Sequence, residues 1–574
     1  MKRTSLLIIG AVFNTVAAFA QQYEVYGAGI SASNYMSAVG DSAGQAVYVI
    51  TPRDKMPFAQ QCVKQGKPQP VLGKAKTAQP YFNVRMALPI PSCYTPTEQG
   101  DKVGLDKGIY THLHSAGMEI LPNGDILAVY FSTPVGKAEA DTCTTFVQCR
   151  RRYGSDEWDM PELLFDTRRG NDQSALLFAD KDTLWFFGGG RDMTDYVPFR
   201  IMKSTDNGAT WTFSVPQMNK RLERYTAQPI SNAFRNKDGW LFVAIDGKSA
   251  TSLLLCSKDG GIHWQDMGGR TNSRHSTIVP LDDNGTLLSM GGKNNNVNGW
   301  NPQNISHDWG ATWEPATASP FPPLGTAQRP CMIRLHSGAL CIVGDSYQHK
   351  KKIAPPKGWQ YGNECYVGIS RDNGKTWQIR TIPVTLPQHH RVDYPSLGYC
   401  TLRQGQDGLI HILTTTNYPG LEIEFNEAWI TSDKTDMTPL AKSGYYCLNG
   451  TFTELFADGK PHYTVTYKDG RRVGTETLYR EDGIKEWEWN RNGDSGSWSI
   501  FRKSGIYDRI SRWNLRPEPR DLPGIRLNGY VAEGYTWEYD RAGMQVESYR
   551  FHNGVLDGSM RQGINSAVIT NEGK

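Results

Sequence analysis

The sequence lacks an excess of charge of either sign. It has 62 Lys and Arg against 58 Asp and Glu, a net charge of +4. Nucleic-acid-binding proteins concentrate positive charge on one surface, so we expect no nucleic-acid partner. Long amphipathic helical runs are also missing, whereas glycine and aromatic residues are frequent, which favours an all-β fold. A chain of 574 residues is too long for one ordinary core, and two or three domains are expected.

Long apolar segments are missing after the first twenty residues. Met1-Lys2-Arg3 precedes an apolar stretch from Leu6 to Phe19, and Ala20 completes an Ala-x-Ala site before Gln21. This pattern is typical of a secretory signal peptide, here residues 1–20. No later stretch is long and apolar enough to span a bilayer. We therefore expect a periplasmic or secreted protein with no membrane span.

Metal-binding spacings are absent as well. None of the ten cysteines lies in a CxxC motif or a Cys/His cluster with zinc spacing, so no metal or other cofactor is expected. An exported chain can instead form disulfides, although reduced buried cysteines are an equal alternative. Plausible close pairs are Cys143 with Cys149, Cys331 with Cys341, and Cys62 with Cys93.

A repeated turn is the most frequent motif of this chain. The pattern Ser-x-Asp-x-Gly-x-x-Trp occurs at 204–211, 257–264, 306–313 and 370–377, and a degenerate copy at 153–158. In such a turn the Asp or Ser binds the local backbone, the Gly adopts a positive φ and the Trp packs beneath. A spacing of roughly fifty residues is the size of one propeller blade.

A second recurring phrase, two apolar strands around a polar Gly turn, predicts one β-hairpin per blade. The blade starts counted from this phrase lie near His112, Asn171, Tyr225, Arg274, Arg329 and Tyr394. Six such units predict an all-β chain with a six-bladed β-propeller.

The repeated turns resemble the Asp boxes of the sialidase-like (BNR) propellers, over about residues 106–432. The resemblance implies a propeller domain over 106–435, with residues 21–105 packed on it or supplying an outer strand that closes the ring. Residues 445–574 repeat an aromatic residue, a polar spacer and a Gly turn at a shorter period, and resemble MORN-type β repeats. This C-terminal part is either a spacer or a surface that binds a glycan or a partner.

The innermost strand of each blade lines the channel of a propeller, so residues at the blade starts are expected to converge. The catalytic candidates are His114, His275 and Tyr394. The substrate-binding candidates are His112, Gln173, Arg274, Lys293, Arg329 and Arg391. Arginine binds a carboxylate with two parallel hydrogen bonds, and His and Tyr transfer protons, which fits an acidic sugar.

The resemblance implies that three arginines bind the sialic acid carboxylate and that a Tyr activated by a Glu is the nucleophile. It also implies an Asp that acts as the acid/base. Tyr394 falls where the nucleophile belongs, but His114 replaces the first arginine, His275 the Glu and Lys293 the second arginine. Other sialidase-like propellers, which are polysaccharide lyases or rhamnose-releasing enzymes, rely on His and Tyr. In a lyase the two imidazoles would divide the roles of base and carboxylate neutraliser, Tyr394 would be the acid, and Arg329 or Arg274 would bind the carboxylate.

We therefore expect an exported carbohydrate-active enzyme that acts on terminal or acidic sugars of complex glycans, as an exo-glycosidase or a uronate-directed lyase. An exo-α-sialidase and a non-catalytic glycan-binding propeller are the alternatives. The expected partner is an acidic oligosaccharide substrate, and the sequence indicates no oligomeric state.

Overall fold

The protein is described from a computed structural model. It describes residues 21–26, 30–32, 46–50, 78–88, 100, 102–104, 114–133, 139, 141–168, 170–191, 193–223, 225–325, 327–345, 365–384, 396–415, 420–432, 448–456, 458–515, 526–527, 529–562 and 567–570. The expected signal peptide and the Cys62–Cys93 pair lie outside these ranges. None of the described helices is long and apolar enough to cross a bilayer.

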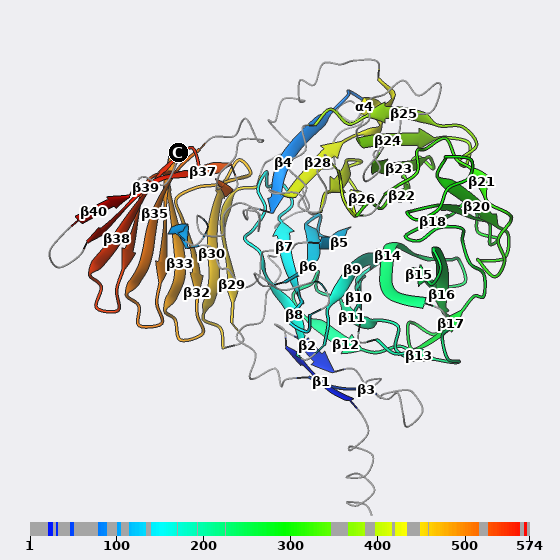
Figure 1. Ribbon diagram of the computed structural model, residues 1–574, viewed down its shortest axis with the longest axis horizontal. Helices are drawn as coiled ribbons and strands as arrows, with labels where there is room; N and C mark the ends of the chain where they lie inside the picture. Colours follow the sequence, from blue (N-terminus) through cyan, green and yellow to red (C-terminus); the bar gives the residue numbers. More distant parts are fainter. Residues whose placement is uncertain are drawn as a thin grey trace, which may run out of the picture.

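Six mainly antiparallel sheets, the blades, form a ring around a central channel (Figure 1). Blade one has β5 (His114–Ile120), β6 (Ile126–Ser132), β7 (Thr145–Arg151) and β8 (Glu162–Arg168). Blade two has β9 (Gln173–Asp180), β10 (Thr183–Gly189), β11 (Arg200–Ser204) and β12 (Trp211–Ser214). Blade three has β14 (Tyr225–Arg235), β15 (Leu241–Gly247), β16 (Thr251–Ser257), β17 (His263–Asp266) and β13 (Gln217–Met218), which pairs with β17.

The remaining three blades follow the same plan. Blade four has β18 (Thr277–Pro280), β19 (Leu287–Met290), β20 (Pro302–Ser306) and β21 (Thr317–Ala318). Blade five has β22 (Cys331–Arg334), β23 (Leu340–Asp345), β24 (Cys365–Ser370) and β25 (Gln378–Thr381). Blade six has β26 (Thr401–Gln404), β27 (Ile410–Leu413) and β28 (Gly420–Phe425), followed by the short helix α4 (Glu427–Thr431).

The first strands of the blades pack against one another in the order β5, β9, β14, β18, β22, β26 and back to β5, so they line the channel. Each pair of neighbouring blades shares a separate apolar cluster, for example around Phe165 and Phe186 between blades one and two. The six-bladed β-propeller is therefore confirmed. Five inner strands begin within three residues of the predicted starts, whereas the sixth begins at Thr401 rather than at Tyr394.

The N-terminal segment supplies outer strands to three blades. β1 (Gln21–Tyr26) and β3 (Ala46–Ile50) extend blade one beside β8, and β2 (Ile30–Ala32) extends blade two beside β12. β4 (Phe82–Leu88) pairs antiparallel with β28 as the outermost strand of blade six. The last blade is thus completed by a strand that precedes blade one in the chain.

A buried ionic cluster holds this closure together. Arg85 on β4 lies 3.1 Å from Glu422 and 2.6 Å from Glu424 on β28, and Arg151 on β7 lies 3.0 Å from Glu422. Burial acts to raise the pKa of Glu422, but Arg151 and Arg85 outweigh it and hold the pKa well below its usual range. Glu422, Glu424 and His411 have a spacing that would suit a metal ion. Because the two guanidinium groups already neutralise these carboxylates, we interpret the cluster as structural.

The four Asp-box turns connect the third and fourth strands of blades two to five, as expected for structural turns. In blade two the backbone N–H of Gly208, with φ +84°, donates to Ser204 Oγ at 2.8 Å. The N–H of Thr210 donates to Asp206 Oδ1 at 2.8 Å, and Trp211 is buried beneath. The same contacts recur in blades four and five.

The C-terminal repeats form one antiparallel sheet beside blade one (Figure 1). Its main strands are β29 (Gly450–Leu455), β30 (Pro461–Lys468), β32 (Thr475–Tyr479), β33 (Lys485–Asn492), β34 (Ser495–Phe501), β35 (Tyr507–Leu515), β37 (Tyr530–Tyr539), β38 (Gln545–His552), β39 (Val555–Gln562) and β40 (Ala567–Thr570). The short strands β31 (Arg471–Arg472) and β36 (Arg526–Leu527) pair with β30 and β37.

The sheet docks on the degenerate Asp box between β7 and β8. The N–H of Asp156 donates to the Gly470 carbonyl at 2.8 Å, and Ser155 Oγ donates to the same oxygen at 3.1 Å. Arg152 lies 2.7 Å from Glu454 across the interface, and both side chains are buried. The turn that departs from the repeated pattern is therefore the contact point of the second domain.

Two of the expected disulfides do not form. Cys149, Cys331 and Cys341 are reduced and buried. On the β22–β23 ladder Cys331 lies opposite Val343, and Cys341 lies opposite Ile333. One residue pair, Met332 with Ile342, therefore lies between the two cysteines. Cys331 Sγ contacts Asn232 Oδ1 at 3.7 Å instead. The alternative of buried, reduced cysteines holds for these positions.

Candidate functional site

Several sequence-predicted side chains meet at the end of the channel where the inner strands begin, which we call the leading mouth. His114 is the first residue of β5, and His275 and Arg329 lie two residues before β18 and β22. Tyr399 lies two residues before β26, and its backbone bridges to that of Arg329. Lys293 follows β19, and its N–H donates to the Arg274 carbonyl at 2.9 Å.

The Tyr399 ring is the centre of this cluster. The His114 ring lies 4.3 Å from it between centroids, and the His275 ring lies edge-on at 4.8 Å. Lys293 Nζ donates to the phenolic oxygen, and the Arg329 guanidinium carbon lies 5.1 Å from the ring centroid. Two imidazoles and two cations therefore surround one phenol, and all four of these residues were predicted from the sequence.

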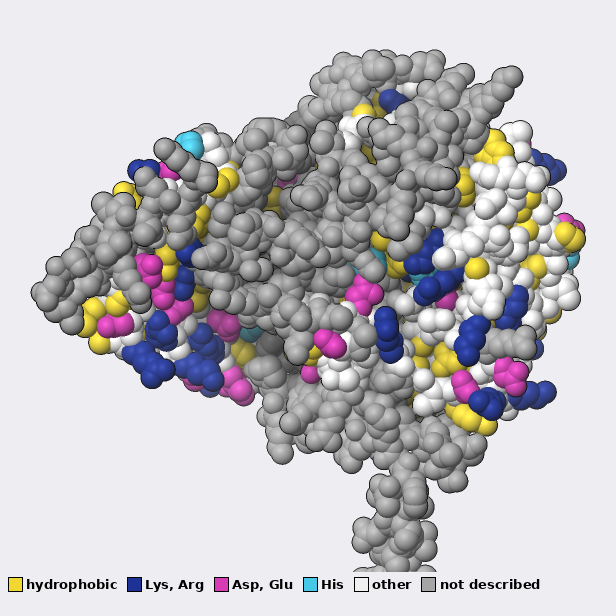
Figure 2. All heavy atoms as spheres, in the orientation of Figure 1, with side chains coloured by type: hydrophobic (Ala, Val, Ile, Leu, Met, Phe, Trp, Pro, Cys, Tyr) yellow, Lys and Arg dark blue, Asp and Glu magenta, His cyan; other side chains and the backbone are white. Residues whose placement is uncertain are grey.

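The cluster is enclosed rather than open to solvent. His114 is 2% exposed, His275 1%, Arg329 1%, and Tyr399 and Lys293 7% each. We expected the imidazoles to face a solvent-filled mouth, and the structure instead buries both. In the space-filling view, Lys or Arg atoms and His atoms gather near the centre of the ring (Figure 2).

His275 is held by a carboxylate from the neighbouring blade. Asp246 on β15 accepts the His275 backbone N–H at 2.9 Å, and its Oδ2 lies 2.8 Å from Nδ1 of the imidazole. Burial, and the nearby Lys293 and Arg274, lower the pKa of His275 to about 3 against the opposing effect of Asp246. The imidazole is therefore neutral, and a hydrogen on Nδ1 facing Asp246 leaves the lone pair on Nε2.

The Nε2 atom of His275 has no hydrogen-bond partner among the described residues. His275 also adopts φ +60°, a left-handed conformation that is uncommon outside glycine. Strained backbone of this kind persists where the surrounding structure enforces it, and functional sites are enriched in it.

Arg329 is a buried cation for which the described residues provide no carboxylate partner. Its Nε and Nη1 atoms make no hydrogen bond within the described part of the chain. Burial lowers the pKa of Arg329, and the Tyr399 phenol acts in the opposite direction. A buried charge is costly unless it is paired, so this guanidinium is suited to an incoming anion.

The other predicted residues are placed differently. Arg274 lies 2.7 Å from Asp246 and donates to Gln228 at 2.8 Å, so its guanidinium already has partners. Gln173 donates to the Glu139 carbonyl and has no contact with Tyr399. The structure does not describe His112, Arg391 and Tyr394.

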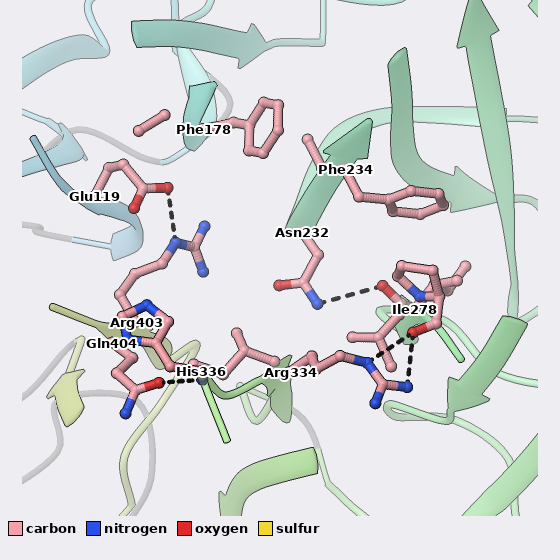
Figure 3. Close-up of a pocket in the computed structure, with 14 residues that line it drawn as sticks. Glu119, Phe178, Asn232, Phe234, Ile278, Arg334, His336, Arg403 and Gln404 are labelled. Atoms are coloured by element: carbon pink, nitrogen blue, oxygen red, sulfur yellow. Dashed lines mark hydrogen bonds and ion pairs between the residues drawn. The ribbon is translucent and has the colours of Figure 1, made fainter. Parts of the chain in front are cut away.

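The opposite end of the channel, where the inner strands end, is the trailing mouth. It holds a cavity of about 300 Å³ to which all six inner strands contribute (Figure 3). Phe178 and Phe234 lie on one side of it, and Arg334, His336 and Gln404 on the other. None of these residues was predicted, because each lies at or near the end of an inner strand and belongs to no motif.

The polar groups of the trailing mouth are occupied by the protein itself. Glu119 and Arg403 form an ion pair at 3.0 Å, and Arg403 also donates to the Leu177 carbonyl at 3.0 Å. Arg334 donates to the carbonyls of Pro280 and Leu281, and Asn232 donates to Thr277 Oγ1 at 3.1 Å. These side chains build the wall of the cavity, whereas the leading mouth keeps unbonded atoms.

A ring of six blades with Asp-box turns and a polar cluster at the channel mouth defines a sialidase-like propeller. The chain belongs to the BNR repeat-like domain family, whose model matches residues 124–412. A protein named sialidase from Bacteroides fragilis (strain YCH46) is 24% identical over 165 residues, which are 27% of this chain and 30% of that protein. The match thus spans less than a third of that relative.

Two solved structures are examples of similar proteins. The intramolecular trans-sialidase of Ruminococcus gnavus is 12% identical with a TM-score of 0.42, over 57% of this chain and 96% of that one. A protein of unknown function from Dyadobacter fermentans is 15% identical with a TM-score of 0.41, over 56% of this chain and 95% of that one.

Proposed function

We propose that this protein is an exported carbohydrate-active enzyme that cleaves the linkage of a carboxylate-bearing sugar at the leading mouth. The observation that carries the proposal is the buried Arg329 guanidinium, whose Nε and Nη1 atoms are unbonded, next to Tyr399 and two imidazoles. Membership of the sialidase-like BNR family supports a glycan substrate.

The groups present suit β-elimination from a uronate. Arg329 and Lys293 neutralise the carboxylate and thereby acidify the C5 proton of the sugar. Nε2 of the neutral His275 removes that proton, and the electron pair forms the C4–C5 double bond. The C4–O bond breaks, and the Tyr399 hydroxyl protonates the departing oxygen. His114, whose ring lies at a tilt against the phenol, positions Tyr399.

Hydrolysis is the second candidate, and the location of Tyr399 favours it. Tyr399 precedes the innermost strand of the last blade, the part of the propeller where the resemblance to sialidases places a nucleophilic tyrosine. Lys293 at its phenolic oxygen would stabilise the negative charge that a nucleophile needs. In this case the substrate would be a terminal acidic sugar such as sialic acid.

The test incubates the purified chain with polyuronates, with sialylated glycans and with neutral glycans of similar size. Elimination produces an unsaturated uronate that absorbs in the ultraviolet, whereas hydrolysis releases sugar without this absorbance. Tyr399→Phe should abolish either product. Cleavage of neutral glycans only, or no cleavage of any carboxylated glycan, would overturn the proposal.

A further inference from the structure

The exposed large apolar side chains of the described residues all lie in the C-terminal sheet. They are Tyr507 at 43%, Tyr535 at 48%, Met544 at 64% and Val555 at 39% exposure. The described part of the propeller has none. A binding surface is therefore expected on the C-terminal sheet rather than on the blades.

Aromatic rings form a continuous strip on one face of this sheet. Tyr535, Trp537 and Tyr539 alternate along β37, so their side chains point to the same face, which spans about 13 Å at 3.3 Å per residue. The Tyr535 and Trp537 rings are stacked at 6.2 Å between centroids. Tyr539 lies 6.0 Å from Tyr507 on β35, and Tyr507 lies 4.9 Å from Phe501 on β34.

The strip is not the core of the sheet. The core is a separate cluster that includes Trp489, Trp498, Trp513 and Tyr549 and packs against Val103. On β35 the alternation is clear, because Trp513 is buried whereas Arg512 is exposed. The strip is thus a second aromatic face, to which the packing of the domain assigns no role.

An unpaired cation lies within the strip. The Arg512 guanidinium is 5.5 Å from the Trp537 ring centroid. It forms no ion pair with any carboxylate in the described residues, whereas Lys485, near Phe501, is paired with Glu488. A free guanidinium next to exposed rings favours a partner that combines a flat apolar face with a negative charge.

We propose that this strip binds an acidic polysaccharide chain. Sugar rings would stack on Tyr535, Trp537 and Tyr539, and a carboxylate would pair with Arg512. Phenol and indole rings suit a sugar because each combines an apolar face with a polar edge. The binding is independent of the leading mouth, and it would hold the chain's polymer substrate near the propeller.

The experiment is affinity electrophoresis of the full chain in native gels that contain polygalacturonate, a neutral cellulose ether, or no polymer. We expect retardation by polygalacturonate, and a roughly tenfold weaker effect for the double variant Tyr535→Ala/Trp537→Ala, from about 1 kcal/mol or less per lost ring contact. Val555→Ala, an exposed apolar residue outside the strip, is the matched control and should migrate like the wild type. Tyr399→Phe should also bind normally, which separates this site from the proposed catalytic one.

Three outcomes would overturn the proposal. The first is no retardation of the wild type, and the second is equal retardation of the double variant. The third is concentration-dependent self-association that the double variant abolishes, because the strip would then be an interface between copies. If the double variant unfolds, Arg512→Gln replaces it, and loss of the preference for polygalacturonate over the neutral polymer is the expected result.

Discussion

The two mouths of the channel are built from the same six strands, yet they differ in how their polar atoms are used. At the trailing mouth Glu119 and Arg403 neutralise each other, and the guanidinium of Arg334 is bonded to carbonyls. At the leading mouth the Arg329 guanidinium and the His275 imidazole keep nitrogens that no described residue binds, although both side chains are buried. The cavity of about 300 Å³ lies at the trailing mouth, and the unsatisfied polar atoms lie at the leading mouth. The difference teaches that a void alone does not locate a reactive site.

The largest expected effect is on the phenol at the leading mouth. Tyr399→Phe removes only the hydroxyl, so the fold should persist while kcat falls about 10³-fold through loss of proton transfer. The matched change at the other mouth is His336→Ala, which should leave kcat within about twofold of the wild type because a surface side chain without a role is dispensable. Steady-state kinetics of both variants measure the contrast, and a reversed order would assign the chemistry to the trailing mouth.

A change of stability should mark the trailing mouth. Glu119→Gln leaves the buried Arg403 guanidinium without its carboxylate, which should lower the free energy of unfolding by about 3 kcal/mol. The kcat of the folded variant should not change. Urea unfolding together with kinetics below the transition checks both parts. A fall in kcat at full folding would show that the two mouths are coupled.

Arg329 should show the opposite pattern. Arg329→Met removes a buried, unpaired charge, so the melting temperature should stay the same or rise. The kcat/KM for a carboxylated substrate should fall about 100-fold, since hydrogen bonds to charged groups contribute about 1.5–3 kcal/mol. Calorimetry and kinetics on one preparation measure both. A large loss of stability would mean that Arg329 is a structural cation.

The smallest expected effect is a pH dependence of stability, which distinguishes two carboxylates of the leading mouth. Asp345 ends β23 and accepts the Leu397 N–H at 2.9 Å, as Asp246 accepts that of His275. Burial raises the pKa of Asp345 to about 6, whereas for Asp246 the nearby His275 and Arg274 outweigh burial and lower it. A raised folded pKa means that the folded state binds the proton more tightly. The stabilising contribution of Asp345 is therefore lost as pH rises from about 4 to 6.

Asp345→Asn should remove this dependence. At pH 8 it should raise the free energy of unfolding on the order of 1 kcal/mol, and at pH 4 it should have no such effect. Thermal melts of wild type and variant at both pH values provide the measurement. Equal shifts at the two pH values would mean that the carboxyl does not titrate in this range.

The sequence predicts the propeller well because both of its signals are local. Turn chemistry marks the Asp boxes, and alternating apolar strands mark the hairpins, so five inner strands were placed within three residues. The sixth was misplaced because Tyr394-Pro395 resembles a blade start. Tyr399 was missed for the same reason, although it has the same two-residue offset from its strand as His275 and Arg329.

What the sequence could not predict depends on distant contacts. The docking of the C-terminal sheet on the degenerate Asp box requires Arg152 to meet Glu454. The burial of the two imidazoles and the satisfied groups at the trailing mouth likewise arise only when the ring closes. No pattern within one segment reports such pairings.

The position of β4 in the chain has a consequence for synthesis. Phe82–Leu88 leaves the ribosome before any inner strand of the propeller, while its partner Gly420–Phe425 comes after the last inner strand. A growing chain must keep this apolar segment from aggregating until nearly every blade has been made. Variants of Arg85 would then reduce the yield of folded protein far more than the specific activity of the molecules that fold.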